Sequence, residues 1–196
     1  MKKMVFAIVV LSLLTAAGSG LGAAEKNDFA NEYEALRADG EEKMAAVNSR
    51  EAYDKLMVEI QVGLEALLQK HAADAPGDAV ELLRARILIQ LKKYPEAEKK
   101  LDALLAGKGP LRAEAQLFRA KVLIETGKIA MAVPLFKQVE SKLPRSIDFF
   151  EVWMALAMDA PDDMLKQEYS LKLLTATDVP QKFIEYRAEI VMNLAN

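Results

Sequence analysis

The sequence predicts an all-α protein built from antiparallel helix pairs that stack on one another. Apolar residues recur every three or four positions through most of the chain, which is the spacing of amphipathic helices. A pattern of apolar and small residues also returns after 35 residues. Segments that are apolar almost all round alternate with segments that have one apolar face. With 52% hydrophobic and 28% charged residues, the 196-residue chain is expected to fold.

Residues 1–24 have the order of a secretory signal peptide. Lys2 and Lys3 precede an apolar run over residues 4–14, and small residues follow as far as Ala24. We therefore expect cleavage after about Ala24 and export to the periplasm or beyond. The run is shorter than the roughly 20 residues that span a bilayer, and an uncleaved anchor or an interfacial helix is the alternative. No later run is long enough to span, so we expect no membrane span after signal removal.

Composition narrows the function further. The chain has no cysteine, which excludes a thiol nucleophile and a thiolate metal site. Loss of the two signal-segment lysines lowers the formal net charge from −3 to −5. An acidic chain is a poor candidate for nucleic-acid binding, which needs clustered Lys and Arg. The densest basic group is expected to be a solvated helix face rather than a polyanion site: Lys92, Lys93, Lys99 and Lys100.

The N-terminal helical segment covers residues 25–77. Gly40 either separates two short helices or weakens a single one at about 1 kcal/mol. Ser49 is placed to cap a long helix over about 50–73. The sequence "DAPGD", residues 74–78, ends that helix, and Asp78 is placed to cap the next. Whether this segment forms an additional repeat stays open.

Repeated units are predicted from residue 78 to the C-terminus, at about 78–112, 113–147 and 148–180, with a final helix at 181–194. A shift of 35 residues pairs several small and large apolar residues of successive units. The pairs are Leu82 with Leu117, Ala85 with Ala120, Leu88 with Leu123, Ala97 with Ala132, Ala120 with Ala155 and Phe136 with Leu171. Ala188 continues the series at a slightly shorter distance. A period of this length indicates stacked units, each of which buries its face against the next.

These units resemble the tetratricopeptide repeat family. The residues that carry the resemblance are Ala85 and Ala120, Tyr94 and Ile129, Ala97 and Ala132, Gly127, and Pro144. The resemblance implies a short right-handed solenoid with the N-terminal helices packed on it. Departures are the 35-residue spacing where the family commonly uses 34, Lys92 at the usual turn glycine, and Gln167 where alanine is expected. Pro134 is expected in the first turn of its helix, since it would kink the helix further in.

The resemblance also implies a concave, partner-binding face lined by the first helices of the units. The residues expected there are Leu82, Arg86, Ile89, Leu117, Lys121, Ile124, Val152, Leu156 and Asp159. A groove with Arg86 and Lys121 among apolar side chains would suit an extended or helical peptide with an acidic or carboxylate group. The alternative is that these residues pack the stack or meet water.

The sequence offers no constellation for catalysis or metal binding. His71 is the single histidine, so a zinc cluster is excluded, and we expect it to pack near a helix end. "DAPDD", residues 159–163, lacks the spacing of a calcium loop, and Asp162 and Asp163 are better explained as a helix cap and first-turn acid. No nucleophile elbow or Gly-rich phosphate loop occurs. We expect no catalytic residue, cofactor or metal.

The expected function is a non-enzymatic protein-protein or peptide-binding scaffold of the bacterial cell envelope. The alternative is an accessory helical module of an envelope enzyme system, such as cell-wall, secretion or redox machinery. Self-association is a third hypothesis, because terminal repeats need a polar outer face. The final helix instead carries Phe183, Ile184, Ile190, Val191 and Leu194.

Overall fold

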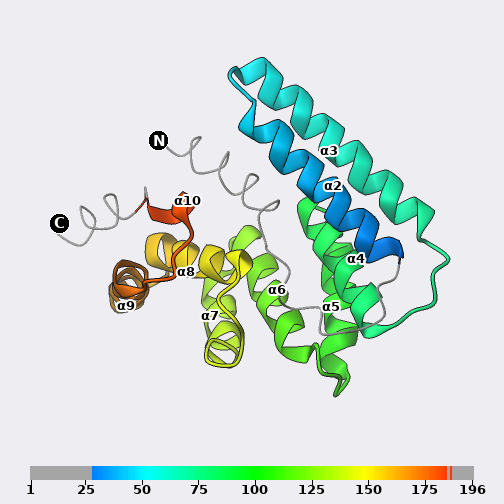
Figure 1. The fold of residues 1–196 in the computed structure, drawn as a ribbon. Helices are drawn as coiled ribbons and strands as arrows, with labels where there is room; N and C mark the ends of the chain where they lie inside the picture. Colours follow the sequence, from blue (N-terminus) through cyan, green and yellow to red (C-terminus); the bar gives the residue numbers. More distant parts are fainter. Residues whose placement is uncertain (1–27, 185, 187–196) are drawn as a thin grey trace. The chain divides into compact units, whose positions relative to one another are not determined.

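The computed structural model describes residues 28–184 and residue 186, and every element in that part of the chain is a helix (Figure 1). The helices are α2 Asp28–Ala45, α3 Arg50–Lys70, α4 Asp78–Gln90, α5 Tyr94–Ala106, α6 Arg112–Glu125, α7 Ile129–Lys137, α8 Ile147–Asp159, α9 Asp163–Thr175 and α10 Gln181–Ile184. The most extensive contacts join helices adjacent in the chain: α2 with α3, α4 with α5, α6 with α7, and α8 with α9. The prediction of an all-α fold of paired helices is confirmed.

The described part of the chain divides between Leu111 and Arg112 into two compact units, unit 1 before this point and unit 2 after it, and each is described by itself. The N-terminal helical segment thus shares a unit with the first predicted repeat. The predicted signal peptide lies outside the described residues, as do Ala188, Glu189, Ile190, Val191 and Leu194 of the predicted final helix. None of the described helices has the length and hydropathy that a bilayer crossing requires.

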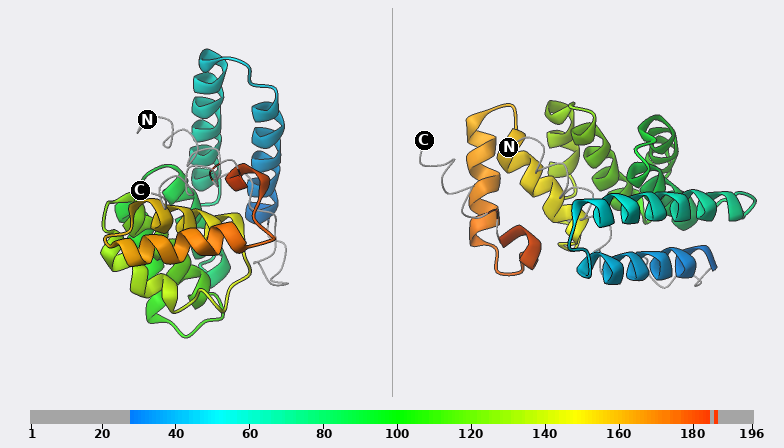
Figure 2. Two further views of the ribbon diagram at one scale, coloured as in Figure 1. Left: turned by 90° about the vertical axis from the view of Figure 1, so that its left-hand side faces the viewer. Right: turned by 90° about the horizontal axis from the view of Figure 1, so that it is seen from above.

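Helices α2 and α3 lie side by side as a long hairpin (Figure 2). Gly40 does not separate two helices, because α2 continues through it and buries it. Ion pairs span the glycine: Arg37 lies 3.8 Å from Glu41, and Asp39 lies 2.9 Å from Lys43. Pairs at this spacing stabilise a helix by a few tenths of a kcal/mol each, about 0.2–0.5 kcal/mol, and offset part of the glycine penalty.

The helix starts in unit 1 follow local capping chemistry. The Ser49 hydroxyl accepts a hydrogen bond from the Ala52 N–H at 3.2 Å, which confirms the predicted cap of α3. The prediction for Asp78 was wrong. Gly77 occupies the N-cap of α4 without a side-chain bond, and Asp78 is the first helical residue. Its carboxylate there meets the positive end of the helix dipole instead.

The turns after α4 and α6 have the same backbone geometry, 35 residues apart. Lys92 has a φ of 57° and Gly127 a φ of 75°, both left-handed. Two N–H groups in each turn donate to carbonyl groups of the preceding helix: Lys92 to Ile89 and Lys93 to Leu88, then Gly127 to Ile124 and Lys128 to Leu123, at 2.7–2.9 Å. These are the paired bonds of a Schellman C-cap, which favours glycine. Lys92 therefore has the left-handed backbone conformation that glycine has at the equivalent position, Gly127.

The small residues of the first two predicted repeats are fully enclosed. Ala85, Ala97, Ala120 and Ala132 each have 0% exposure. Alanine at such positions lets the backbones of paired helices approach closely, and large side chains such as Leu101 fill the space beside the contact. In these pairs the sequence repetition therefore coincides with a repetition of packing.

The third pair, α8 and α9, departs from the 35-residue spacing. Leu171, expected to replace Phe136, is 60% exposed. Ser170 and Leu173 are buried instead, 34 residues after Phe136 and Val139. The expected equivalence of Phe136 and Leu171 was thus wrong by one position. Tyr169, another buried residue of α9, has its ring centre 6.2 Å from that of Phe136.

Pro134 also differs from its expectation. It is the sixth residue of α7, beyond the first turn. A proline at that depth removes one backbone hydrogen bond from the helix. Helix α7 is accordingly short, with nine residues, and ends at Lys137.

Candidate functional site

The nine residues of the predicted partner face lie on α4 in unit 1 and on α6 and α8 in unit 2. Six of them are buried: Leu82, Ile89, Leu117, Lys121, Val152 and Leu156. Arg86 and Ile124 are half-buried, and Asp159 is exposed. The accessible part of this face is therefore much smaller than its sequence pattern implies. The partner-binding role of the nine residues stays a prediction.

Arg86 is held by α2. Its guanidinium carbon lies over the Tyr33 ring, 5.7 Å from the ring centre. Such a contact stabilises by about 0.5–1 kcal/mol or more when partly desolvated. Gln90, one turn along α4, donates a hydrogen bond to the Tyr33 hydroxyl at 2.7 Å. Tyr33 thus orders two polar side chains on the face of α4 that was expected to meet a ligand.

Lys121 is inside unit 2, between α6 and α8. Its Nζ donates to Asp148 Oδ1 at 2.5 Å and lies 2.5 Å from Glu151 Oε2. The lysine side chain is 5% exposed, and each carboxylate side chain is 10% exposed. Burial acts to lower the pKa of Lys121, but the charges of Asp148 and Glu151 outweigh it and raise the pKa above 10.5. Lys121 therefore links α6 to α8 rather than facing an external ligand.

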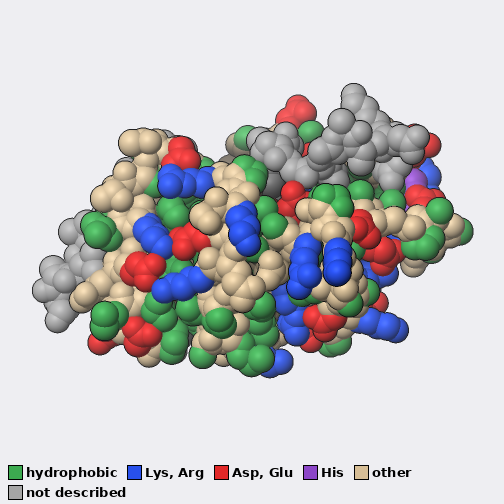
Figure 3. Space-filling view, turned by 90° about the horizontal axis from the view of Figure 1, so that it is seen from below, with side chains coloured by type: hydrophobic (Ala, Val, Ile, Leu, Met, Phe, Trp, Pro, Cys, Tyr) green, Lys and Arg blue, Asp and Glu red, His purple; other side chains and the backbone are tan. Residues whose placement is uncertain are grey.

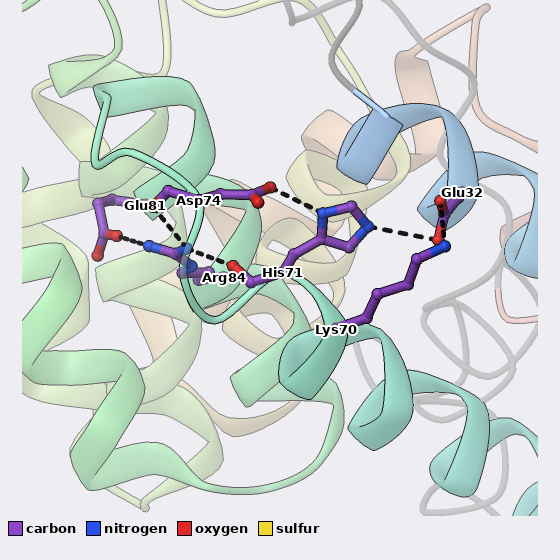
Figure 4. A network of polar contacts seen from close by, with 6 residues as sticks. All are labelled: Glu32, Lys70, His71, Asp74, Glu81 and Arg84. Carbon is purple, nitrogen blue, oxygen red and sulfur yellow. Dashed lines mark hydrogen bonds and ion pairs between the residues drawn. The ribbon is translucent and has the colours of Figure 1, made fainter.

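A second polar cluster surrounds His71 in unit 1 (Figure 4). His71 is the C-cap of α3 and is 6% exposed. Its ring stacks on Phe29 with centres 4.8 Å apart. Nδ1 lies 2.7 Å from Asp74, and Nε2 lies 3.3 Å from Glu32 of α2, which also accepts a hydrogen bond from Lys70 at 2.7 Å. The expectation that His71 packs at a helix end is confirmed.

Arg84 of α4 completes the cluster from the other side. Its Nη2 donates to the backbone carbonyl of His71 at 2.6 Å and to that of Asp74 at 3.2 Å. Its Nη1 pairs with Glu81, which also accepts from Lys100 of α5 at 2.7 Å. Burial acts to raise the pKa of Glu81, but the hydrogen bonds from Lys100 and Arg84 outweigh it, and the pKa is lowered.

The geometry around His71 is that of a structural contact between helices rather than a catalytic centre. A general base must come within hydrogen-bonding reach of a substrate. Both ring nitrogens of His71 are already engaged by carboxylates, and one ring face is covered by Phe29. The cluster joins α2, α3, α4, α5 and the connection after α3, which gives it a clear structural role.

In unit 2, a series of ion pairs joins α7 and the turn after it to α9. Glu140 accepts hydrogen bonds from Trp153 Nε1 at 2.9 Å and from Lys172 at 2.7 Å. Lys172 also donates to Glu168 at 2.7 Å, and Lys137 of α7 donates to Glu168 at 3.1 Å. Figure 3 shows Lys and Arg side chains interspersed with Asp and Glu on the face in view. This mixing of signs gives no support to a polyanion site on that face.

Sequence reasoning missed the roles of Arg84 and Glu32. One signal was present for Arg84: a glutamate three residues before it indicates an ion pair within the helix. Nothing in the sequence connects Glu32 with Lys70 and His71, because these partners lie far apart along the chain.

The described residues contain no group of three or more histidine or carboxylate side chains that could hold a metal ion. Comparison with known proteins assigns no family: no family model matches the chain, and no match is found among curated proteins or solved structures.

Proposed function

We propose that the chain is a non-enzymatic scaffold of the bacterial cell envelope that binds a protein or peptide through tetratricopeptide-like helix pairs. The observation that carries the proposal is the match between α4–α5 and α6–α7. Both pairs have a left-handed Schellman turn and fully buried alanines, 35 residues apart. Repeats of this kind present extended binding surfaces rather than enclosed active sites. The sequence of residues 1–24 supports the envelope location.

The partner is expected to carry an acidic or carboxylate group. Arg86 has a guanidinium ordered by Tyr33, and an ordered guanidinium is suited to paired hydrogen bonds with a carboxylate. Because Lys121 is already committed to Asp148 and Glu151, the recognition of acidic groups depends on Arg86. Binding would then be centred on unit 1.

The test is capture from an envelope extract on the immobilised chain, with partners quantified by mass spectrometry. We expect Arg86→Glu to weaken capture of a specific partner several-fold. Lys99→Glu is the matched control, because it makes the same charge change at an exposed position of α5. Thermal melting of each variant checks that the fold is intact. A captured partner that binds wild type and Arg86→Glu equally would contradict the proposed face.

The identity of the captured partner then separates the scaffold from the accessory-module alternative. Capture of a cell-wall, secretion or redox enzyme whose turnover changes on binding would place the chain within that enzyme system. Capture of a partner without catalytic activity would favour a simple scaffold.

A further inference from the structure

The outer face of α3 carries a row of exposed residues with heptad spacing. The residues, here called the α3 row, are Glu51, Lys55, Val58, Val62, Glu65 and Gln69. Their spacing alternates between four and three, which keeps them on one side of a helix. The buried residues of α3, among them Ile60, lie on the opposite side, toward α2. Val58 and Val62 are 59% and 61% exposed, so the α3 row has apolar residues at its centre.

The α3 row is complementary to itself when two copies run antiparallel. A two-fold axis at the level of Ile60 brings residues equally distant from Ile60 face to face. Val58 then meets Val62 of the partner subunit, and Lys55 meets Glu65 of the partner subunit. At the ends, Glu51 meets Gln69 of the partner subunit, which can donate a hydrogen bond to a carboxylate. Apolar layers at the centre are thus flanked by layers of opposite charge.

Other arrangements of the α3 row lack this match. A parallel pair would place each Lys55 against its own copy and each Glu65 against its own copy, and both contacts are repulsive. Sliding the antiparallel pair by one heptad would place Val62 opposite Glu65, which leaves the apolar residues without apolar partners. The charge order along α3 therefore selects one orientation and one register.

We propose that a second copy of this chain docks antiparallel on the α3 row. Because the α3 row lies on the side of α3 opposite to α2, the contact joins one α3 helix of each copy. The pair of Lys55 and Glu51 within one chain, 3.0 Å apart, is 77% and 80% exposed and contributes little, so Lys55 is readily exchanged to a new partner. Glu51, Lys55 and Val58 also line a shallow hollow with Arg50 and Asp54. With two valines from each chain at its centre, the dimer is weak and depends on concentration.

Sedimentation equilibrium over a concentration series tests the contact. We expect reversible dimerisation of the wild-type chain and its loss in Val58→Asp and Val62→Asp. Met131→Asp is the matched control, because Met131 on α7 is 59% exposed and lies outside the α3 row. A chain that stays monomeric at every concentration would overturn the proposal, and so would a dimer that Val58→Asp leaves unchanged.

Charge exchange tests the orientation. Lys55→Glu alone places two glutamates together, and Glu65→Lys alone places two lysines together, so each variant should dimerise about tenfold more weakly. An equimolar mixture of the two variants restores both oppositely charged layers and should dimerise about as well as wild type. Glu65→Lys also removes a contact with Lys93, but a loss of stability cannot explain a gain on mixing. A mixture no tighter than its components would contradict the proposal.

The absence of native cysteine allows a direct test of register. In the antiparallel pair, residue 58 faces residue 62 of the partner subunit. Oxidation of mixed Val58→Cys and Val62→Cys should therefore give a mixed disulfide dimer faster than either variant gives its own dimer. A parallel contact would favour the two like dimers, and a dimer through another surface would favour none of the three. Either result would overturn the proposal.

Discussion

Replacing Lys121 with methionine should destabilise unit 2 severely. Met is similar in length and keeps the apolar part of the side chain, but it leaves Asp148 and Glu151 without the ammonium that lies 2.5 Å from each. Both carboxylates are 10% exposed, so little solvent is available to replace that interaction. Removing one partner of a buried ion pair costs about 3–5 kcal/mol. We expect a loss of this size in the free energy of unfolding.

The assay is thermal and urea unfolding followed by circular dichroism. For a chain of this length, about 2–4 °C of Tm accompanies each kcal/mol, so Lys121→Met should lower the Tm by about 6–20 °C. Lys172→Met is the matched control, because Lys172 also meets two carboxylates, Glu140 and Glu168, but its side chain is 31% exposed. A pair at such a position contributes about 1 kcal/mol or less.

The reasoning would be refuted if the two lysine variants lost the same stability. The pH dependence gives a second check. Because the pKa of Lys121 is raised above 10.5, its contribution is fully present below that pH and is lost as the pH rises further. The wild-type chain should therefore lose stability in strong alkali over a range in which Lys121→Met changes less.

Two further predictions concern a turn and an acid-sensitive contact. Lys92→Gly should stabilise the chain by up to about 1 kcal/mol, because glycine adopts the left-handed backbone without strain, whereas Gly127→Ala should destabilise it by a similar amount; urea unfolding of both variants measures the opposite signs. The pKa of Glu81 is lowered below 4.5, so its contribution is present above that pH and is lost as the pH falls through the lowered pKa. Glu81→Gln should flatten the wild-type loss of Tm below about pH 4.5, and an unchanged acid profile would show that the contact with Lys100 and Arg84 contributes nothing.

Local chemistry made much of the fold predictable from the sequence. The apolar spacing gave the helix pairs, and Ser49 and Asp162 were recognised as caps because a cap needs only neighbouring residues. Gly127, one of the residues that carry the resemblance to tetratricopeptide repeats, lies in a left-handed turn. Local rules did not decide between the two alternatives at Gly40. The residue lies within a single helix, between flanking ion pairs.

The predicted partner face was harder to judge, because burial depends on residues that are distant in the sequence. Arg86 and Lys121 lie 35 residues apart, at equivalent positions of two repeats. Lys121 is nevertheless buried between two carboxylates, whereas Arg86 lies over a tyrosine of α2. The spacing of Asp148 and Glu151 gives no indication that they would meet Lys121. The 35-residue repeat therefore placed these residues on one face of a helix, but it did not determine whether that face is exposed to solvent.

The pairing of each helix with its neighbour in the chain has a kinetic consequence. When the main contacts are local in sequence, little loop entropy is lost before they form, and folding is fast. Helices α4 and α5 can pair before α6 and α7 do, since neither pair needs a segment from the far end of the chain. Each newly formed pair then buries the apolar surface between its two helices, which shortens the time during which that surface is open to aggregation.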